Sequence, residues 1–137
     1  MVDRRPEQLL RRAHGELDQL SSQRRPEENF IHAHMAALRA GAALLALHPA
    51  AGARRRAVRS VWEQIAELDD TWASWAALFA AGAPVRAAIE SGRQRSLDPR
   101  QVARTERAAA DFVAIVSDAI SAVGADDGES ERPAIAS

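Results

Sequence analysis

The stretch Ser60–Ala81, SVWEQIAELDDTWASWAALFAA, decides the fold of this chain. It contains all three tryptophans and one of the three phenylalanines of a sequence that has no tyrosine. Its large apolar residues recur at steps of four, three and four, which is the spacing of one helical stripe: Leu68, Trp72, Trp75 and Phe79. Buried aromatic side chains dominate core energetics. The other helices are therefore expected to pack on this stripe.

Capping signals predict that the stretch forms two helices. Ser60 and Glu63 fit a capping box, in which the hydroxyl accepts from the third backbone N–H and the carboxylate reaches back to the cap. A short helix is predicted from Ser60 to about Leu68. Asp69 or Asp70 then caps a longer helix that carries the other two tryptophans. The segment 82–84, Gly-Ala-Pro, is expected to kink the chain before a further turn or two.

Composition favours helix and sets limits on chemistry. The chain has 137 residues, 47% of them hydrophobic and only 4% aromatic, with alanine the main contributor, which favours helix over sheet. All 18 basic residues are arginine, and they nearly balance 19 acids to a net charge of −1, so a general nucleic-acid coat is not expected. The absence of cysteine excludes disulfides, thiolate zinc sites and thiol catalysis.

The two helices before the tryptophan stretch are amphipathic. The first begins at Pro6 and should end near 21–25, with an apolar seam at steps of three and four: Leu10, Ala13, Leu17 and Leu20. The second begins at Pro26 and stops at His48-Pro49. Its seam also recurs at steps of four and three, with three residues widening it: Ile31, Met35, Leu38, Ala42 and Leu45, then Phe30, Leu44 and Leu47. Gly41 among alanines predicts a smooth patch that a neighbour can approach closely.

A final long helix completes the predicted bundle. Asp98-Pro99 opens it, and Gly124 is the expected stop. Its predicted core seam is Ala109, Val113, Val116, Ile120 and Val123. The fold is predicted as all-α, an up-and-down bundle of four long helices plus one short helix before the Trp-bearing helix. Residues 1–124 form one domain, and the acidic tail 125–137 is expected to be disordered.

No metal, cofactor or catalytic motif is predicted. His32 and His34 are two residues apart on a helix, so they point about 200° apart and cannot share an ion. His34, at the edge of an apolar face, is expected to be a core histidine with one satisfied nitrogen. The paired acids Glu27-Glu28 and Asp69-Asp70 stand at helix starts, where capping and the helix dipole explain them.

Membrane attachment is not predicted either. The N-terminus has no apolar signal-peptide core, and no run approaches 18 uninterrupted apolar residues. The expected location is cytoplasmic.

One basic linker is a candidate ligand contact. The segment 48–59, HPAAGARRRAVR, carries Arg54, Arg55, Arg56 and Arg59. Guanidinium groups fork onto phosphates bidentately, and a flexible linker lets several converge. The linker holds no aromatic residue to stack on a base, and a solvated charged loop is the alternative interpretation.

Three sequence blocks together resemble a known family. They are 33–46 (AHMAALRAGAALLA), 59–63 (RSVWE) and 75–83 (WAALFAAGA), with the basic linker between the first two. In this order they resemble a subfamily of small actinobacterial HEPN proteins. The resemblance implies a HEPN-like up-and-down bundle, commonly dimeric. His34, Arg39, Trp62, Trp75 and Phe79 are the block residues expected to have structural roles.

The resemblance leaves the activity open. The superfamily includes metal-independent RNases, nucleotidyltransferase-associated toxins and antitoxins, and non-catalytic binding versions. Its RNases carry an Arg, four to six residues, then a His, and two copies meet across the dimer. Arg25 and His32 satisfy this spacing here, but at the start of the second helix rather than in the later half of the bundle, and no His follows His48.

Three hypotheses follow. The leading one is a cytoplasmic, non-catalytic HEPN-like homodimer that binds RNA or a protein partner through the linker arginines. The second is a ribonuclease that uses Arg25 and His32 across a dimer. The third is a purely structural homodimer without a ligand.

Overall fold

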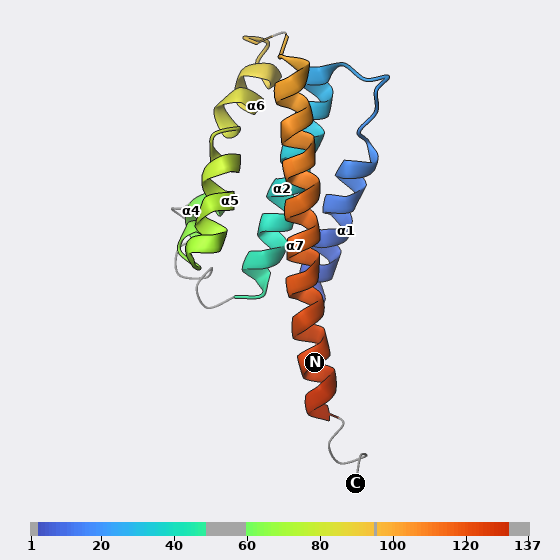
Figure 1. The fold of residues 1–137 in the computed structure, drawn as a ribbon, viewed down its shortest axis with the longest axis vertical. Helices are drawn as coiled ribbons and strands as arrows, with labels where there is room; N and C mark the ends of the chain where they lie inside the picture. The colour runs from blue at the N-terminus through green and yellow to red at the C-terminus, as the bar shows by residue number, and fades with distance from the viewer. Residues whose placement is uncertain (1–2, 49–59, 95, 132–137) are drawn as a thin grey trace.

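The computed structural model describes residues 3–48, 60–94 and 96–131, with side chains described as far as residue 125. Within these ranges all regular structure is helical, so the predicted all-α bundle is confirmed (Figure 1). The helices are α1 (Arg5–Asp18), α2 (Pro26–Ala46), α4 (Val61–Ala66), α5 (Asp70–Ala80), α6 (Ala83–Glu90) and α7 (Pro99–Glu131).

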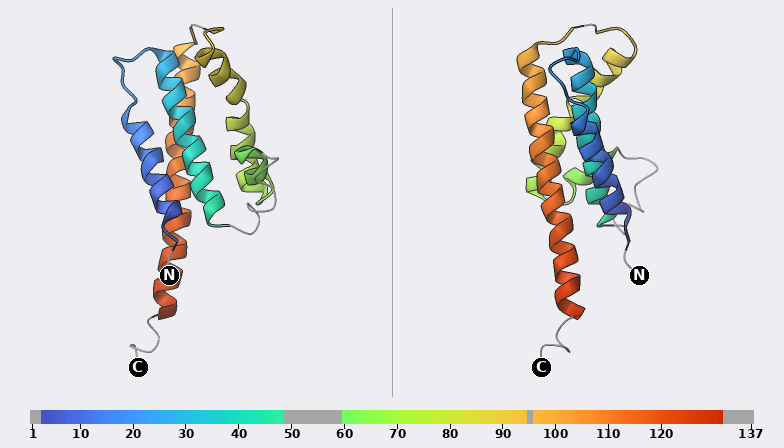
Figure 2. Two further views of the ribbon diagram at one scale, coloured as in Figure 1. Left: turned by 180° about the vertical axis from the view of Figure 1, so that it is seen from behind. Right: turned by 90° about the vertical axis from the view of Figure 1, so that its right-hand side faces the viewer.

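Helix α2 lies at the centre of the bundle. It packs against α1, α4, α6 and α7. Figure 2 shows α1 on one side of α2 and the α4–α6 segment on the other. Helix α7 runs alongside α2. The C-terminal end of α7 projects beyond the other helices (Figure 1).

Local signals fix the helix starts as predicted. The Ser60 hydroxyl accepts a hydrogen bond from the Glu63 backbone N–H at 3.1 Å, and the Asp69 carboxylate accepts from the Trp72 N–H at 2.9 Å. The tryptophan stretch is therefore two capped helices. Asp98 accepts from the Arg100 N–H at 3.0 Å at the start of α7. Each cap satisfies an N–H that the first helical turn leaves without a partner.

Helix α1 ends earlier than predicted, at Asp18 rather than within 21–25. The side chain of Asn29 stabilises the segment between α1 and α2, because it binds both the backbone N–H and the backbone carbonyl of Ser21. Its oxygen accepts from the Ser21 N–H at 3.2 Å, and its amide donates to the Ser21 carbonyl at 2.8 Å. These two hydrogen bonds pair backbone polar groups of Ser21, which lies beyond the end of α1 and has no helical partners for them.

The buried face of α2 differs from the predicted seam. All five predicted seam residues are only half-buried, whereas the fully buried face consists mainly of small residues: Ala33, Ala36, Ala37, Ala40, Gly41, Ala43 and Leu44. A central helix needs small side chains where its neighbours approach, and its larger residues fill the margins. The predicted smooth patch at Gly41 is confirmed, since a Cβ there would lie 2.8 Å from Cδ1 of Ile65 on α4.

The aromatic side chains form one connected cluster. Trp62 and Phe79 are 5% and 1% exposed, with ring centroids 5.2 Å apart. Phe112 of α7, absent from the predicted seam, is fully buried and contacts Trp62, Phe79 and the two outer tryptophans. Trp72 and Trp75 are partly buried at the edge of the core. The tryptophan stretch thus organises the core, with a phenylalanine from another helix at its centre.

The end of α7 was predicted wrongly. The helix runs through Gly124 to Glu131, and Val123, a predicted core residue, is 44% exposed. A glycine costs a helix only about 1 kcal/mol, and no proline stands within the eight residues after Gly124 to end it. Residues 132–137 of the predicted tail lie outside the described residues. The division at residue 124 stays a prediction.

Among the described helices, α7 alone has the length and apolar character to cross a membrane, over Pro99–Ala125. Its best 18-residue window has a mean hydropathy of 1.6, and 28% of that window is buried. This is weak evidence for a span, because the core helix of a soluble protein passes the same test. Phe112, Val113 and Val116 of α7 pack inside the bundle. The cytoplasmic location stays a prediction.

Candidate functional site

His34 is the core histidine that its position predicted. Its side chain is 1% exposed, and Nε2 donates to the Phe79 carbonyl at 3.1 Å. Within the described chain Nδ1 has no hydrogen-bond partner. Burial lowers the pKa of His34, and the bond to Phe79 opposes that effect only in part. The ring is therefore buried among core residues, as its position predicted.

His32 belongs to a polar cluster between α1 and α2. Its Nδ1 lies 2.8 Å from Oε2 of Glu16, and Nε of Arg39 donates to Oε1 of Glu16 at 3.4 Å. A carboxylate only accepts hydrogen bonds, so the proton between the two groups is carried by His32 Nδ1. Glu16 therefore fixes both the ring orientation and the tautomer of His32, and it holds Arg39 beside it.

The cluster lines a cavity of about 370 Å³. The α1 side supplies Arg12, Gly15, Glu16 and Gln19, which are spaced as one helix face, and α2 supplies His32 and Arg39, seven residues apart. The cavity carries two guanidinium groups, one carboxylate and one imidazole. This arrangement suits an anion rather than a metal ion.

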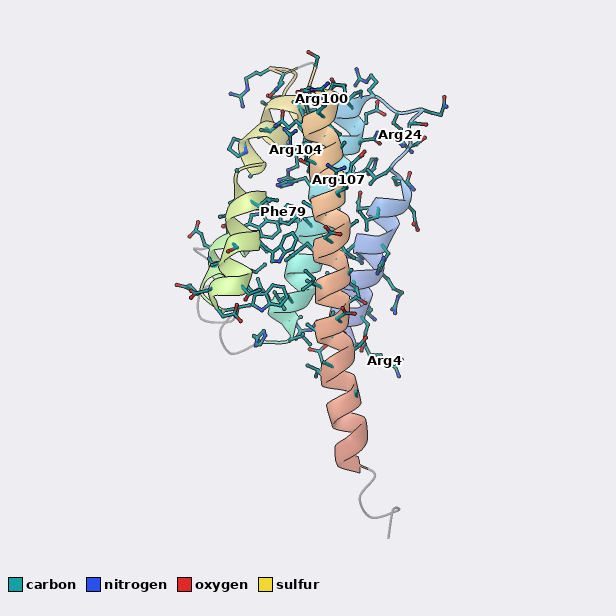
Figure 3. All side chains as sticks on the ribbon, in the orientation of Figure 1. Arg4, Arg24, Phe79, Arg100, Arg104 and Arg107 are labelled. Atoms are coloured by element: carbon teal, nitrogen blue, oxygen red, sulfur yellow. The ribbon has the colours of Figure 1, made fainter. Side chains whose placement is uncertain are left out.

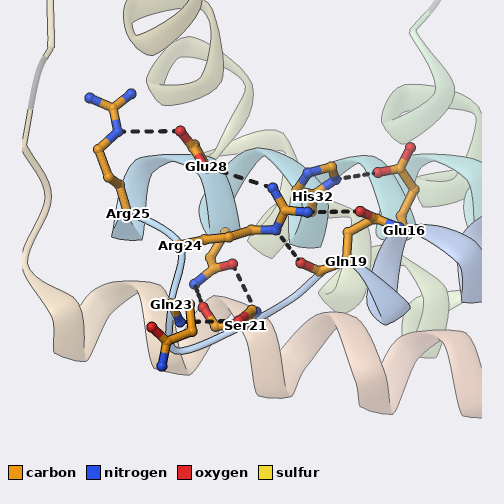
Figure 4. Close-up of polar contacts among 9 residues, drawn as sticks. Glu16, Gln19, Ser21, Gln23, Arg24, Arg25, Glu28 and His32 are labelled. Carbon is orange, nitrogen blue, oxygen red and sulfur yellow. Dashed lines mark hydrogen bonds and ion pairs between the residues drawn. The ribbon is translucent and has the colours of Figure 1, made fainter.

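Figure 4 shows that Arg25 points away from His32. Its side chain is 71% exposed and donates to Glu28 at 3.3 Å. The neighbouring Arg24 donates to the Gln19 carbonyl at 2.6 Å and to the Gln19 side-chain oxygen at 2.9 Å, and it pairs with Glu28 at 3.9 Å. One copy of the chain thus does not bring Arg25 and His32 together. Their meeting across a dimer stays a prediction.

The remaining sequence candidates divide clearly. Trp62 and Phe79 are core residues, and Trp75 packs at the edge of the core. The four linker arginines lie outside the described residues, so their role as phosphate contacts stays a prediction: Arg54, Arg55, Arg56 and Arg59. His32 contacts Glu16 and His34 contacts Phe79, so the two rings point to different neighbours, as expected for residues two apart on a helix. In the described part of the chain, no three His, Asp or Glu side chains are placed to hold a metal ion.

A second candidate surface covers α7 and the adjoining edge of α5. Leu78 of α5 is 50% exposed and Ile115 of α7 is 37% exposed. Basic residues occupy the N-terminal half of the exposed α7 face, where Figure 3 shows Arg100, Arg104 and Arg107 in a row. Acidic residues, Asp111 and Asp118, follow on the same face in the C-terminal half. We call this surface the α7 face.

Comparison with known protein families finds a match. A family model described as SAV_6107-like HEPN matches residues 21–117. No curated protein and no solved structure matches the chain. The matched segment begins after α1 and ends within α7.

Proposed function

This chain belongs to the SAV_6107-like HEPN family, and we propose that it acts there as a non-catalytic binding module that works as a homodimer. The two copies pair along their α7 faces. The observation that carries this proposal is the exposed apolar surface of α7, a helix whose most apolar window is only 28% buried. Exposed apolar surface beside charged residues is typical of an association site.

The order of charges along α7 favours a second copy as the occupant. Positive residues precede negative ones, so a parallel pair of α7 helices would oppose like charges, whereas an antiparallel pair opposes unlike charges. A twofold axis level with Ala109 places Arg107 opposite Asp111 of the second copy. The same axis places Arg100 opposite Asp118 of the second copy. Such a self-complementary patch is the requirement for a twofold dimer.

The non-catalytic half of the proposal is supported by the separation of the candidate RNase residues within one copy, and it requires that the dimer does not bring Arg25 of one copy to His32 of the other. Arg25 is engaged by Glu28 on the exposed surface, and His32 is engaged by Glu16 in the cavity. A reacting phosphodiester needs both groups within hydrogen-bond reach of the same bond. Labelled RNA incubated with the wild-type chain and with His32→Ala tests this half. Cleavage that depends on His32 would contradict it.

A charge exchange tests the dimer. Arg100 and Asp118 are separated by about 27 Å along one helix, so they can meet only between copies. We expect Arg100→Asp and Asp118→Arg each to weaken dimerisation by about tenfold, and the double variant to recover it. Light scattering and sedimentation give the oligomeric state, and circular dichroism confirms folding.

Two controls make this result specific. Arg11→Asp changes the same charge on exposed α1, away from the α7 face, and should leave dimerisation unchanged. Ile115→Arg places a charge within the apolar part of the α7 face and should give a monomer. A wild-type monomer at tens of micromolar, or single and double charge variants that behave alike, would refute the paired α7 arrangement.

RNA is the ligand we propose for the dimer, with the linker arginines as its phosphate contacts. Replacing Arg54, Arg55, Arg56 and Arg59 together by Gln should weaken RNA binding and reduce its dependence on salt. RNA binding that is unchanged in this variant would exclude the linker as the contact.

A further inference from the structure

A pocket between the α5–α6 segment and α7 is lined mainly by apolar side chains. Its volume is about 270 Å³. Leu78, Ala81 and Val85 form one wall, Ala108 of α7 contributes to the other, and Phe30 of α2, 2% exposed, lies at the base. We propose that this pocket binds a small monocarboxylic acid with an apolar body. The site lies within one copy of the chain, so it does not depend on dimerisation.

The pocket exists because large side chains fill only part of the space between the α5–α6 segment and α7. In the described structure α5 and α6 have little direct packing against α7, and aromatic rings bridge the distance instead. Trp75 and Phe79 of α5 contact Phe112 of α7, with ring centroids 5.6 and 5.2 Å apart. Toward α6 the facing residues are small, with Ala81 on one side and Ala108 on the other. Protein interiors are normally close-packed, so an apolar hollow of this kind is typical of a ligand site.

One edge of the pocket offers hydrogen-bond donors. Gln101, Arg104 and Thr105 lie one turn apart on α7. In the described part of the chain, the side chains of Gln101 and Arg104 make no hydrogen bond or ion pair, whereas the Thr105 hydroxyl donates to the Gln101 carbonyl at 3.1 Å. The guanidinium and amide groups are therefore the donors left for a ligand. None of the described lining residues is acidic, so no carboxylate of the pocket competes for them.

These donors suit a carboxylate. A guanidinium group pairs two parallel N–H groups with the two carboxylate oxygens, and a single arginine balances a single negative charge. The apolar walls require that the rest of the ligand be apolar as well. The pocket is smaller than the roughly 300–1,000 Å³ of sites for drug-sized molecules. A medium-chain aliphatic acid or an arylacetic acid combines these properties at the size that the pocket allows.

Calorimetric titration with matched probes tests the proposal. The probes are octanoate beside octanamide, phenylacetate beside phenylacetamide, and acetate. We expect each larger acid to bind more tightly than its amide, which lacks the charge, and more tightly than acetate, which lacks the apolar body. Tighter binding of octanoate identifies an aliphatic ligand, and tighter binding of phenylacetate identifies an aromatic one. Equal binding of acid and amide, or of the larger acids and acetate, would overturn the proposal.

Variants locate the binding. Arg104→Gln should weaken binding of both larger acids by about tenfold and leave the amides unaffected, whereas Arg11→Gln on exposed α1 should change neither. Ala81→Leu should fill the pocket and weaken binding of acids and amides alike. Its matched control is Ala87→Leu, at an exposed position of α6 that does not line the pocket. Circular dichroism confirms that each variant folds. Wild-type affinity for the acids in Arg104→Gln or in Ala81→Leu, or an equal loss in the controls, would refute the assignment of this pocket.

The oligomeric state is a separate variable, because Leu78 and Arg104 also belong to the α7 face. The titrations are therefore repeated with Ile115→Arg, which changes the α7 face outside the pocket. Acid binding by this variant supports a site within one chain, whether or not the wild type dimerises, and light scattering judges the dimer independently. Acid binding by the wild type alone would place the site between two copies and contradict its assignment to one chain.

Discussion

His34 joins three segments of the bundle through one side chain. It extends from α2 and binds the Phe79 carbonyl of α5, and it stacks on Phe30 with ring centroids 6.1 Å apart. It also packs against Gly82 at the start of α6, where a Cβ would lie 2.9 Å from Cδ2 of the imidazole. The α5–α6 kink therefore depends on both residues, because any side chain at Gly82 would displace the ring.

The buried imidazole should make stability depend on pH. Burial lowers the pKa of His34 below its ordinary value of 6.5, with Arg86 adding to this effect and the Phe79 bond and Glu90 opposing it. The unfolded chain therefore binds a proton at a higher pH than the folded chain does. The free energy of unfolding should be highest above pH 6.5 and should fall as the pH drops from there through the folded-state pKa.

Urea unfolding at a series of pH values checks this dependence. His34→Gln keeps an N–H donor for Phe79 but does not titrate, so it should lose stability less steeply on acidification than the wild type does. His14→Gln, which removes an exposed histidine of α1, serves as the control for loss of a histidine outside the core. Parallel curves for the wild type and His34→Gln would show that His34 is not the titrating group.

Substitution by alanine should have opposite effects on stability at Gly41 and at Gly15. Gly41→Ala puts a methyl group 2.8 Å from Cδ1 of fully buried Ile65 and 3.0 Å from Cγ1 of Val61. We expect it to lower the free energy of unfolding by about 1–3 kcal/mol despite the better helix propensity. Gly15→Ala meets nothing and should raise that free energy by about 0.5–1 kcal/mol. Thermal melts of both variants measure the contrast, and a shift of the same sign in both would contradict the packing at Gly41.

At the scale of elements, Phe112 connects α7 to the tryptophan helices. Phe112→Ala should cost about 3–5 kcal/mol, because it leaves a cavity among four aromatic rings. Phe112→Leu should cost less, about 1.5 kcal/mol or below. Denaturant titration followed by tryptophan fluorescence measures both effects. An alanine variant as stable as the leucine variant would show that the ring is not a central packing element.

The helix starts could be predicted because both partners of each cap lie within three residues of each other. Ser60 with the Glu63 N–H and Asp69 with the Trp72 N–H are local contacts that a spacing rule captures. The buried alanine face of α2 could not be predicted in this way. Side-chain size points to Ile31 and Met35, whereas burial depends on how many neighbours surround the helix. Phe112 was missed because the Val and Ile seam beside it already completed a helical repeat.

The candidate site likewise depends on contacts between helices, which local sequence patterns do not predict. Its parts, Glu16, His32 and Arg39, are joined by the register of α1 against α2, which no single-helix pattern specifies. The sequence singled out His32 and Arg39 for other reasons, one from an RNase spacing and one from a family block. The only local signal was Gly15 in the interior of a helix, between Arg12 and Gln19.

At the scale of the whole molecule, the buried contact between Glu27 and Leu97 joins two distant segments of the chain. The Glu27 carboxylate, expected only to compensate a helix dipole, accepts the Leu97 N–H at 3.1 Å across 70 residues of sequence. Leu97 packs with Phe30 and Val102 in a small second cluster. This cluster closes one end of the bundle, so the chain that leads into α7 is fixed at its start. At the other end, α7 continues past the last core contact.

That last contact defines the smallest chain expected to fold. Ile120, 6% exposed, is the last buried residue of α7 among those whose side chains the structure describes. A chain of residues 1–124 should keep the wild-type free energy of unfolding within about 1 kcal/mol. A chain that ends at Asp118 loses Ile120 and should be less stable by about 2 kcal/mol or more. Denaturant midpoints of the two truncated chains decide the matter, and equal losses in both would place part of the folding unit beyond Gly124.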